Sequence, residues 1–401
     1  MFRLGSGLVL LIGLLFTHPA QAHVRSESFS RWQYDDQTLS VRFTINAREA
    51  TRIPNLTYAA TPDVVLAEYL ATKIAVPSPD GNCRPAQGFL PVAARAGFLQ
   101  AEAVWRCSDN PVELEIHAFF DLSAEHSHFA SFESAGRLQQ RLLSSEDQVW
   151  MLATGKQGAY VNETGGHTFK AYLGQGFRHI LSGLDHIVFL LALLLICRRR
   201  SDIVWAVTGF TLGHSITLAL AALGMVQPNV PAVEATIGLT IALIAVERTA
   251  SSLVNALPLA GFCAALLLLM APLTFMQDAR LSTSLLLGLA LFSFCYLLLA
   301  RELGSRGGFR ILITALFGLI HGLGFAGAFL AGGLNKDLLL LPLAGFNIGI
   351  ELGQLALVAV FLSIAVLLQS HARLQAQMSE LTTAMVCGLG VFWFVQRSFV
   401  H

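Results

Sequence analysis

The chain has 401 residues, of which 54% are hydrophobic and 13% are charged, and its formal net charge is zero. This composition is too apolar for an ordinary soluble protein, so it predicts several membrane spans and the lipid bilayer as a partner. Because the charges balance, they give no indication of a nucleic-acid partner.

The N-terminus has the pattern of a secretory signal peptide, residues 1–22. A basic Arg3 precedes a short apolar segment that ends in Ala20-Gln21-Ala22, which is the small-residue pattern of a cleavage site. An uncleaved anchor helix is the alternative, but the apolar segment is short for a span. Cleavage would leave His23 with a free amine, and its amine and imidazole together could chelate Cu(II).

Residues 23–166 mix polar and apolar residues and predict a β-rich, sandwich-like domain outside the cytoplasm. The segments TLSVRFTINA (38–47) and VELEIHAFFDL (112–122) alternate in hydrophobicity, as half-buried strands do. The segment TPDVVLAEYLATKIAV predicts one short helix, opened by Thr61 and Pro62.

This domain also contains candidate cross-linking and metal-binding residues. Cys83 and Cys107 could form a disulfide if the compartment is oxidising. His126 and His128 lie two residues apart, so on a strand they would face the same way and could share a metal. Exposed histidines on an edge strand would give the same pattern. Together with His23, they suggest a domain that captures a metal and delivers it to the membrane part.

Residues 167–401 are nearly all apolar and predict an α-helical polytopic bundle of seven or eight spans. Each candidate run is near or above the roughly 20 residues that a span needs. The runs are 180–197, 203–224, 232–250, 257–276, 282–300, 310–332, 340–368 and 380–397. Glycine or proline interrupts the fourth, sixth and seventh runs, so seven spans is the alternative to eight.

The distribution of basic residues between these runs predicts the orientation. The loops after spans one, three, five and seven carry Arg198, Arg199, Arg200, Arg248, Arg301, Arg306, Arg310 and Arg373. The intervening loops on the other side carry Arg280 and Lys336. The positive-inside rule therefore places the first domain outside the cytoplasm. If the source is a Gram-negative bacterium, this is the periplasm, and the spans lie in the bacterial inner membrane.

Histidines and acids recur inside these spans, where ionisable groups are costly. The histidines are His179, His186, His214 and His321, and the other polar candidates are Asp185, Glu234, Glu351 and Asn347. Interhelical hydrogen bonding would explain any one of them. As a set they indicate a path for an ion, and imidazole with carboxylate suits Ni, Co, Zn and Cu. A proton relay would use the same residues.

Spacing limits how these residues can act. On a regular helix His179 and His186 share a face but lie about 10 Å apart, which is too far for one metal with bonds of about 2 Å. They can share an ion only if the helix opens, and Gly183 between them is the expected place. Asp185 points to another face and is expected to orient a histidine of a neighbouring helix.

Glycine spacing predicts close packing of the last helices. Two small-xxx-small pairs occur, Gly318 with Gly322 and Gly349 with Gly353. The first pair brackets His321 and the second brackets Glu351. If the sixth and seventh spans pack together, these two side chains would lie near each other.

Four segments, HILSGLDHIVFLL, FTLGHSITL, FGLIHGLGFAGA and FNIGIELGQL, occur in this order within residues 170–400. They resemble the membrane half of the HupE/UreJ family of hydrogenase and urease accessory proteins, in its longer branch with a periplasmic N-terminal domain. The family's first-span pattern is His-Pro-x-x-Gly-x-Asp-His, followed by a methionine four residues on. The residues that match are His179, Gly183, Asp185 and His186, while Ile180 and Leu190 replace the proline and the methionine. The resemblance implies a permease for nickel or a related metal.

The sequence therefore predicts a permease or metal-homeostasis accessory protein, not an enzyme, whose substrate is a divalent transition metal. No Gly-x4-Gly-Lys-Ser/Thr loop is present, so no nucleotide is expected. An intramembrane metalloenzyme is one alternative, although the His-Glu-x-x-His pattern is absent, and a non-transporting sensor or assembly scaffold is another. Metalloenzyme maturation proteins and periplasmic metal-delivery proteins are the expected protein partners.

Overall fold

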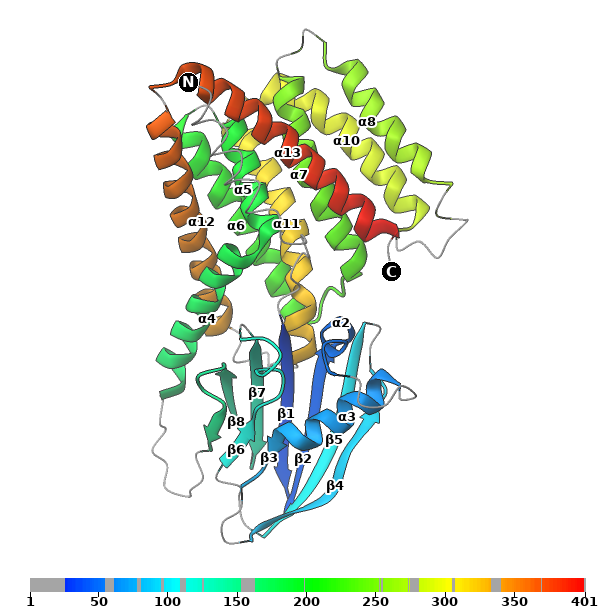
Figure 1. Ribbon diagram of the computed structural model, residues 1–401, viewed down its shortest axis with the longest axis vertical. Helices are drawn as coiled ribbons and strands as arrows, with labels where there is room; N and C mark the ends of the chain where they lie inside the picture. The colour runs from blue at the N-terminus through cyan, green and yellow to red at the C-terminus, as the bar shows by residue number, and fades with distance from the viewer. Residues whose placement is uncertain are drawn as a thin grey trace. The chain divides into compact units, whose positions relative to one another are not determined.

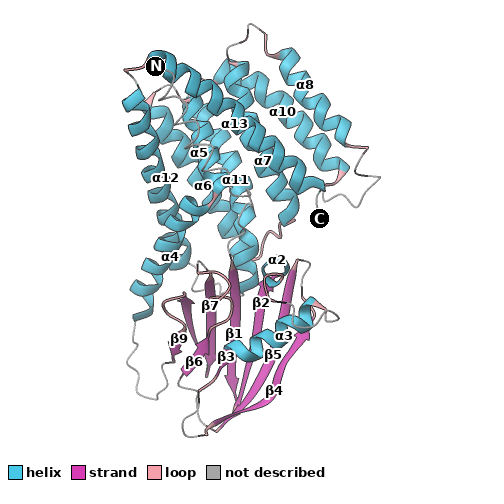
Figure 2. Cartoon of the chain, viewed as in Figure 1, coloured by secondary structure: helices cyan, strands magenta, loops and turns pink. Residues whose placement is uncertain are grey.

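The structure is a computed structural model, and it divides into two compact units (Figures 1 and 2). One comprises Val24–Tyr172, and the other comprises Leu173–Gly327 with Leu343–His401. The structure describes residues 26–54, 61–77, 81–94, 97–108, 113–124, 126–152, 163–197, 199–251, 253, 255–272, 274, 281–304, 307–332, 340–368 and 370–399. The predicted signal peptide, residues 1–22, and the candidate His23 lie outside these ranges.

The first unit is built on two β-sheets, as the sequence predicted. A six-stranded sheet has the order β4-β5-β2-β1-β7-β8, and a three-stranded sheet has the order β3-β6-β9. The strands are β1 (Glu27–Asp35), β2 (Thr38–Asn46), β3 (Ile74–Ala75), β4 (Cys83–Val92), β5 (Phe98–Cys107), β6 (Glu113–Ile116), β7 (Ser127–Ser134), β8 (Arg137–Leu143) and β9 (Val149–Met151). Strands β1 and β7 pair in parallel, and the other pairs are antiparallel.

Residues of both sheets share one hydrophobic core. The alternating residues of β2, from Leu39 to Ile45, are buried as predicted. Helix α2 (Ala47–Ala50) follows β2, and the predicted short helix is α3 (Pro62–Lys73), which packs on β4 and β5. The second predicted strand is shorter than expected: β6 ends at Ile116, and the chain then turns at Phe119, whose φ is 68°.

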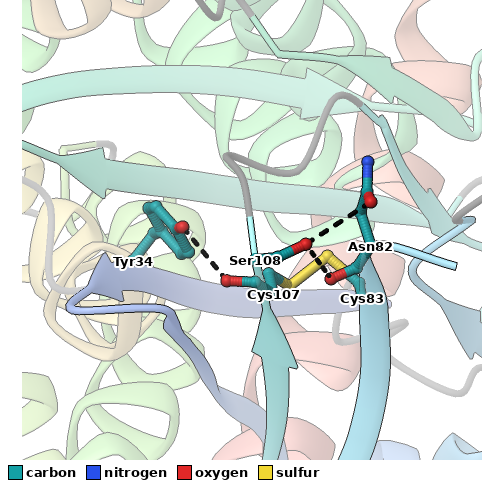
Figure 3. Close-up of a disulfide and its surroundings, with 5 residues drawn as sticks. All are labelled: Tyr34, Asn82, Cys83, Cys107 and Ser108. Carbon is teal, nitrogen blue, oxygen red and sulfur yellow. Dashed lines mark hydrogen bonds between the residues drawn. A yellow bond between two sulfur atoms is a disulfide. The ribbon is translucent and has the colours of Figure 1, made fainter. Parts of the chain in front are cut away.

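A disulfide joins Cys83 of β4 to Cys107 of β5 (Figure 3), as the sequence allowed. The two residues face each other in the antiparallel register of these strands. Tyr34 Oη donates to the main-chain oxygen of Cys107 at 3.3 Å. The bond closes a loop with a sequence separation of 24, so the unfolded chain loses entropy equivalent to about 3.5 kcal/mol in a loop-closure model.

The second unit is a bundle of apolar helices. They are α4 (Glu163–Ser182), α5 (Leu184–Ile196), α6 (Arg200–Ala222), α7 (Val230–Ala250), α8 (Leu257–Met270), α10 (Thr283–Leu303), α11 (Gly307–Gly332), α12 (Leu340–Leu368) and α13 (Ala372–Phe399). Within the described ranges, six are long and apolar enough to cross a membrane, and the bent pair α4–α5 makes up to seven. Helix α8, the fourth predicted span, has 14 residues, or about 21 Å, which is short of a hydrocarbon core of about 30 Å.

Three pairs of helices approach so closely that a Cβ on the contacting glycines would meet the partner's backbone. Gly318 and Gly322 of α11 lie against α6, and Gly349 of α12 lies against α4. Gly238 of α7 and Gly390 of α13 lie against each other, and α7 and α13 are side by side in Figure 1. Small residues allow such approach in membranes. The two glycine pairs named in the sequence therefore do not face each other: α11 and α12 meet through Phe325 and Phe346, whose ring centroids are 4.7 Å apart.

Candidate metal centre

The first span contains a break at Gly183 that brings two predicted ligands together. Helices α4 and α5 meet there at an angle of 70°. A Cβ on Gly183 would lie 2.7 Å from His186 Nδ1 and 2.9 Å from the main-chain oxygen of His179. Only glycine therefore fits at the bend. The His179 and His186 ring centroids lie 4.7 Å apart, so the expected opening of the helix at this residue is confirmed.

Two further predicted histidines join this pair from other helices. His214 of α6 lies 6.2 Å from His179 and 6.3 Å from His186 between ring centroids. His321 of α11 lies 5.6 Å from His186. One ligand atom from each of His179, His186 and His214 lies within 4.8 Å of the others. We call these four residues the histidine cluster.

The histidine cluster is buried among aromatic side chains. His214 and His321 are 0% and 2% exposed. Phe210, Phe189 and Phe346 contact cluster rings at centroid distances of 4.6 to 6.5 Å. His179 and His186 are half-buried as residues, but His179 Nε2 and both ring nitrogens of His186 are themselves buried.

The donor set fits a borderline divalent metal. His321 Nδ1 lies 2.8 Å from the main-chain oxygen of Phe317, and its Nε2 is buried with no hydrogen-bond partner among the described residues. Nitrogens around a tetrahedral zinc-like ion are about 3.3 Å apart. The three imidazoles of His179, His186 and His214 would therefore have to move together by about 1 Å to bind one ion, which side-chain rotation can supply.

Among the described residues Asp185 pairs with an arginine and not with a histidine of a neighbouring helix, so the structure does not support that prediction. Its carboxylate forms a salt bridge with Arg397 of α13, with an N–O distance of 2.9 Å. Arg397 also donates to the main-chain oxygen of Glu234 at 2.9 Å. An arginine close to the carboxylate outcompetes an imidazole because it is always charged.

Asn347 and Glu351 lie one helical turn apart on α12. Asn347 interacts with His214, while its Nδ2 donates to the main-chain oxygen of Leu343 at 2.8 Å. No hydrogen bond or ion pair in the described part of the chain joins Glu351 to His321. The expected proximity of these two residues required α12 to pack on α11 through its glycines, whereas those glycines face α4.

His126 and His128 in the first unit are buried, not exposed, and β7 is an interior strand. Their ring nitrogens alternate with the hydroxyls of Ser26, just before β1, and of two β1 serines at 2.6 to 2.8 Å, in the order Ser26, His126, Ser28, His128, Ser30. Trp32 Nε1 donates to Ser30 Oγ at 2.9 Å and ends this serine–histidine ladder. A metal on either histidine would have to displace a serine, so this geometry does not support the predicted metal pair.

We expect the serine–histidine ladder to make the protein acid-sensitive. Burial lowers the pKa of His128 to about 3, and burial and the neighbouring His128 hold the pKa of His126 well below its usual 6.5. In the unfolded chain these two histidines therefore bind protons near pH 6.5, whereas in the folded chain they stay neutral at that pH. Stability falls as pH drops below about 6.5, by about 2 kcal/mol per histidine at pH 5.

Thermal unfolding of the full chain in detergent between pH 7.5 and 5 would measure this loss. The control is a variant with His126→Gln and His128→Gln, in which both residues keep hydrogen-bonding groups but no longer titrate. Its melting temperature should depend less steeply on pH than that of the wild type. Parallel pH profiles for the two proteins would contradict the prediction.

The sequence predictions missed the charged partners within the bundle. Arg397 pairs with Asp185, and Arg310 of α11 donates to Glu247 of α7 at 2.9 Å. Tyr296 of α10 donates to the other Glu247 oxygen. The sequence does indicate that such partners exist, because an acidic residue buried in a membrane span requires a basic or hydrogen-bonding partner.

A bundle of long apolar helices with histidines buried inside it defines a multi-pass membrane protein. A family model described as HupE / UreJ protein matches residues 155–295 and 288–397. Because these matches cover more than half of the chain, the chain belongs to the HupE/UreJ family. A search of curated proteins found no match.

Proposed function

We propose that this protein is a permease for a divalent transition metal, which passes through the histidine cluster as substrate. The observation that carries the proposal is the meeting of His179, His186 and His214 from three helices, with ligand atoms within 4.8 Å. Intramembrane ionisable groups of this kind mark ion paths more often than they serve packing.

The ligand type of the histidine cluster limits which metal ions can be the substrate. Neutral imidazoles bind Ni, Co, Zn and Cu, whereas Mg and Ca prefer oxygen ligands. Asn347 beside His214 and Glu351 one turn further along α12 offer oxygen ligands on a helix that contacts the histidine cluster through Phe346, so we propose them for the same path. The bent first span supplies two ligands from one chain segment, and broken helices are a common way to build a transport site at membrane depth.

The excess of arginine in alternate loops supports an orientation of the protein in the membrane. We propose an inner-membrane protein of a bacterium, with a cleaved signal peptide and the β-rich domain in the periplasm. Proteins of metalloenzyme maturation or periplasmic metal delivery would exchange the metal with it. The protein would not act as an enzyme.

Cellular metal content, measured by mass spectrometry in cells given Ni, Co, Zn or Cu, tests the proposal. Wild-type protein should change the content of one metal, and His186→Ala at matched membrane levels should not. His371→Ala is the control, because His371 is an exposed residue outside the histidine cluster, and it should behave like wild type. If wild type changes no metal, transport is contradicted. Loss of an organic substrate instead would favour the metalloenzyme.

A further inference from the structure

The carboxylate next to the histidine cluster is held by an arginine near the other end of the chain. Asp185 precedes His186 directly, in the first turn of α5. Arg397 Nη2 donates to the two carboxylate oxygens at 3.0 and 2.9 Å, and Nη1 donates to the main-chain oxygen of Glu234. The Arg397 and Asp185 side chains are 8% and 20% exposed, so water screens their attraction only weakly.

While this ion pair is intact, the charges around the histidine cluster do not favour a cation. Imidazoles that act as ligands are neutral, and the N-terminal end of α5 carries the positive end of the helix dipole. Arg397 also lies close enough to His321 to interact with it electrostatically. A divalent ion entering here finds the carboxylate adjacent in sequence to His186 already neutralised by Arg397, and uncompensated charge is costly to bury.

We propose that Asp185 is the counter-charge of the metal ion and that Arg397 controls its availability. A divalent cation at the histidine cluster competes with Arg397 for the Asp185 carboxylate. When Arg397 holds Asp185, the cluster binds metal weakly. When Arg397 moves away, the carboxylate stabilises the bound ion, and the return of Arg397 promotes its release. This inference rests on the proposed function.

The position of Arg397 suits such an exchange. It lies in the last turn of α13, so it can leave Asp185 without unpacking the helix. The glycine contact between Gly238 of α7 and Gly390 of α13 lies about two turns earlier. The Arg397 guanidinium already lies 5.4 Å from the centroid of the Trp393 ring, within cation–π range, so this contact is still available to it when Asp185 is released.

Titration of the purified full chain with Co²⁺ alone, followed by visible absorption, tests the inference. Arg397→Gln leaves Asp185 available, so Co²⁺ should bind at least about tenfold more tightly than in wild type, and it should dissociate more slowly. Asp185→Asn removes the counter-charge, so Co²⁺ should bind at least about tenfold more weakly. A purely structural role for the pair predicts weaker binding in both variants.

Arg248→Gln is the matched control. Arg248 also links α5 and α13, through the Leu195 main-chain oxygen and Ser379 Oγ, both at 2.7 Å, but without a carboxylate. Its Co²⁺ affinity should equal that of wild type; tightening here as well would assign the effect to loosened helices and overturn the inference. If Arg397→Gln does not fold, Arg397→Lys should still bind more tightly than wild type, because lysine lacks the second contact.

The outcomes separate the two proposals. If wild type binds Co²⁺ and Arg397→Gln binds it equally or more weakly, the inference is overturned and the permease proposal stands. If neither wild type nor Arg397→Gln binds Co²⁺, both are overturned.

Discussion

Replacing Gly318 with alanine should separate α11 from α6 and destroy the histidine cluster. A Cβ at this position would lie 2.1 Å from the main-chain oxygen of Phe210 and 3.0 Å from the His214 nitrogen. Neither atom can move without shifting α6. We expect a loss of about 3 kcal/mol or more, since a forced backbone shift is at the upper end of overpacking costs, and we expect metal binding to be lost.

Gly288→Ala on α10 is the matched control, because a Cβ there would meet nothing within 4 Å. Alanine favours a helix over glycine by about 1 kcal/mol, so this variant should be as stable as wild type or more so. Thermal unfolding in detergent and Ni²⁺ titration measure both effects. If Gly318→Ala unfolds at the wild-type temperature and binds Ni²⁺, the close contact of α6 and α11 is not required.

Replacing His214 with alanine should lower the affinity for Ni²⁺ by at least about a hundredfold. Loss of a residue that merely supports a ligand costs 10- to 100-fold, and His214 contributes a ligand atom of the predicted site itself. Because His214 forms no ion pair among the described residues, its loss should leave the bundle folded. The change should therefore appear in metal binding before it appears in stability.

Calorimetric titration of the purified full chain with Ni²⁺ measures this affinity. Thr217→Ala is the control on the same helix: Thr217 is buried, and its hydroxyl bonds within α6 to the main-chain oxygen of Gly213. This variant should bind Ni²⁺ like wild type. Equal affinity in the His214 and Thr217 variants would show that His214 is not a ligand.

The histidine cluster could be predicted from the sequence because its members are unusual where they stand. Histidines in apolar spans are costly, and the seven-residue spacing of His179 and His186 required a break, for which Gly183 was the available residue. The strand β2 and the helix α3 were predictable because their patterns depend on local spacing alone.

The partners of these residues could not be predicted in the same way. The glycine pairs of α11 and α12 identify a contacting face but not the helix that it meets. Asp185 and Arg397 are 212 residues apart, so only the folded bundle pairs them. The alternating serines of β1 are equally compatible with a strand that exposes them to solvent. Only the pairing of β1 with β7 places His128, and His126 just before β7, against them.

The three glycine-packed pairs described above have a consequence for how the bundle can move. Backbones in such direct contact cannot slide without collision, so each pair behaves as one rigid rod. His179 belongs to the rod α4–α12, and His214 and His321 belong to the rod α6–α11. His186 lies on α5, which the Asp185–Arg397 ion pair ties to the rod α7–α13. We therefore expect the number of imidazoles on one ion to depend on the relative positions of three rods, as in the rocking of rigid domains.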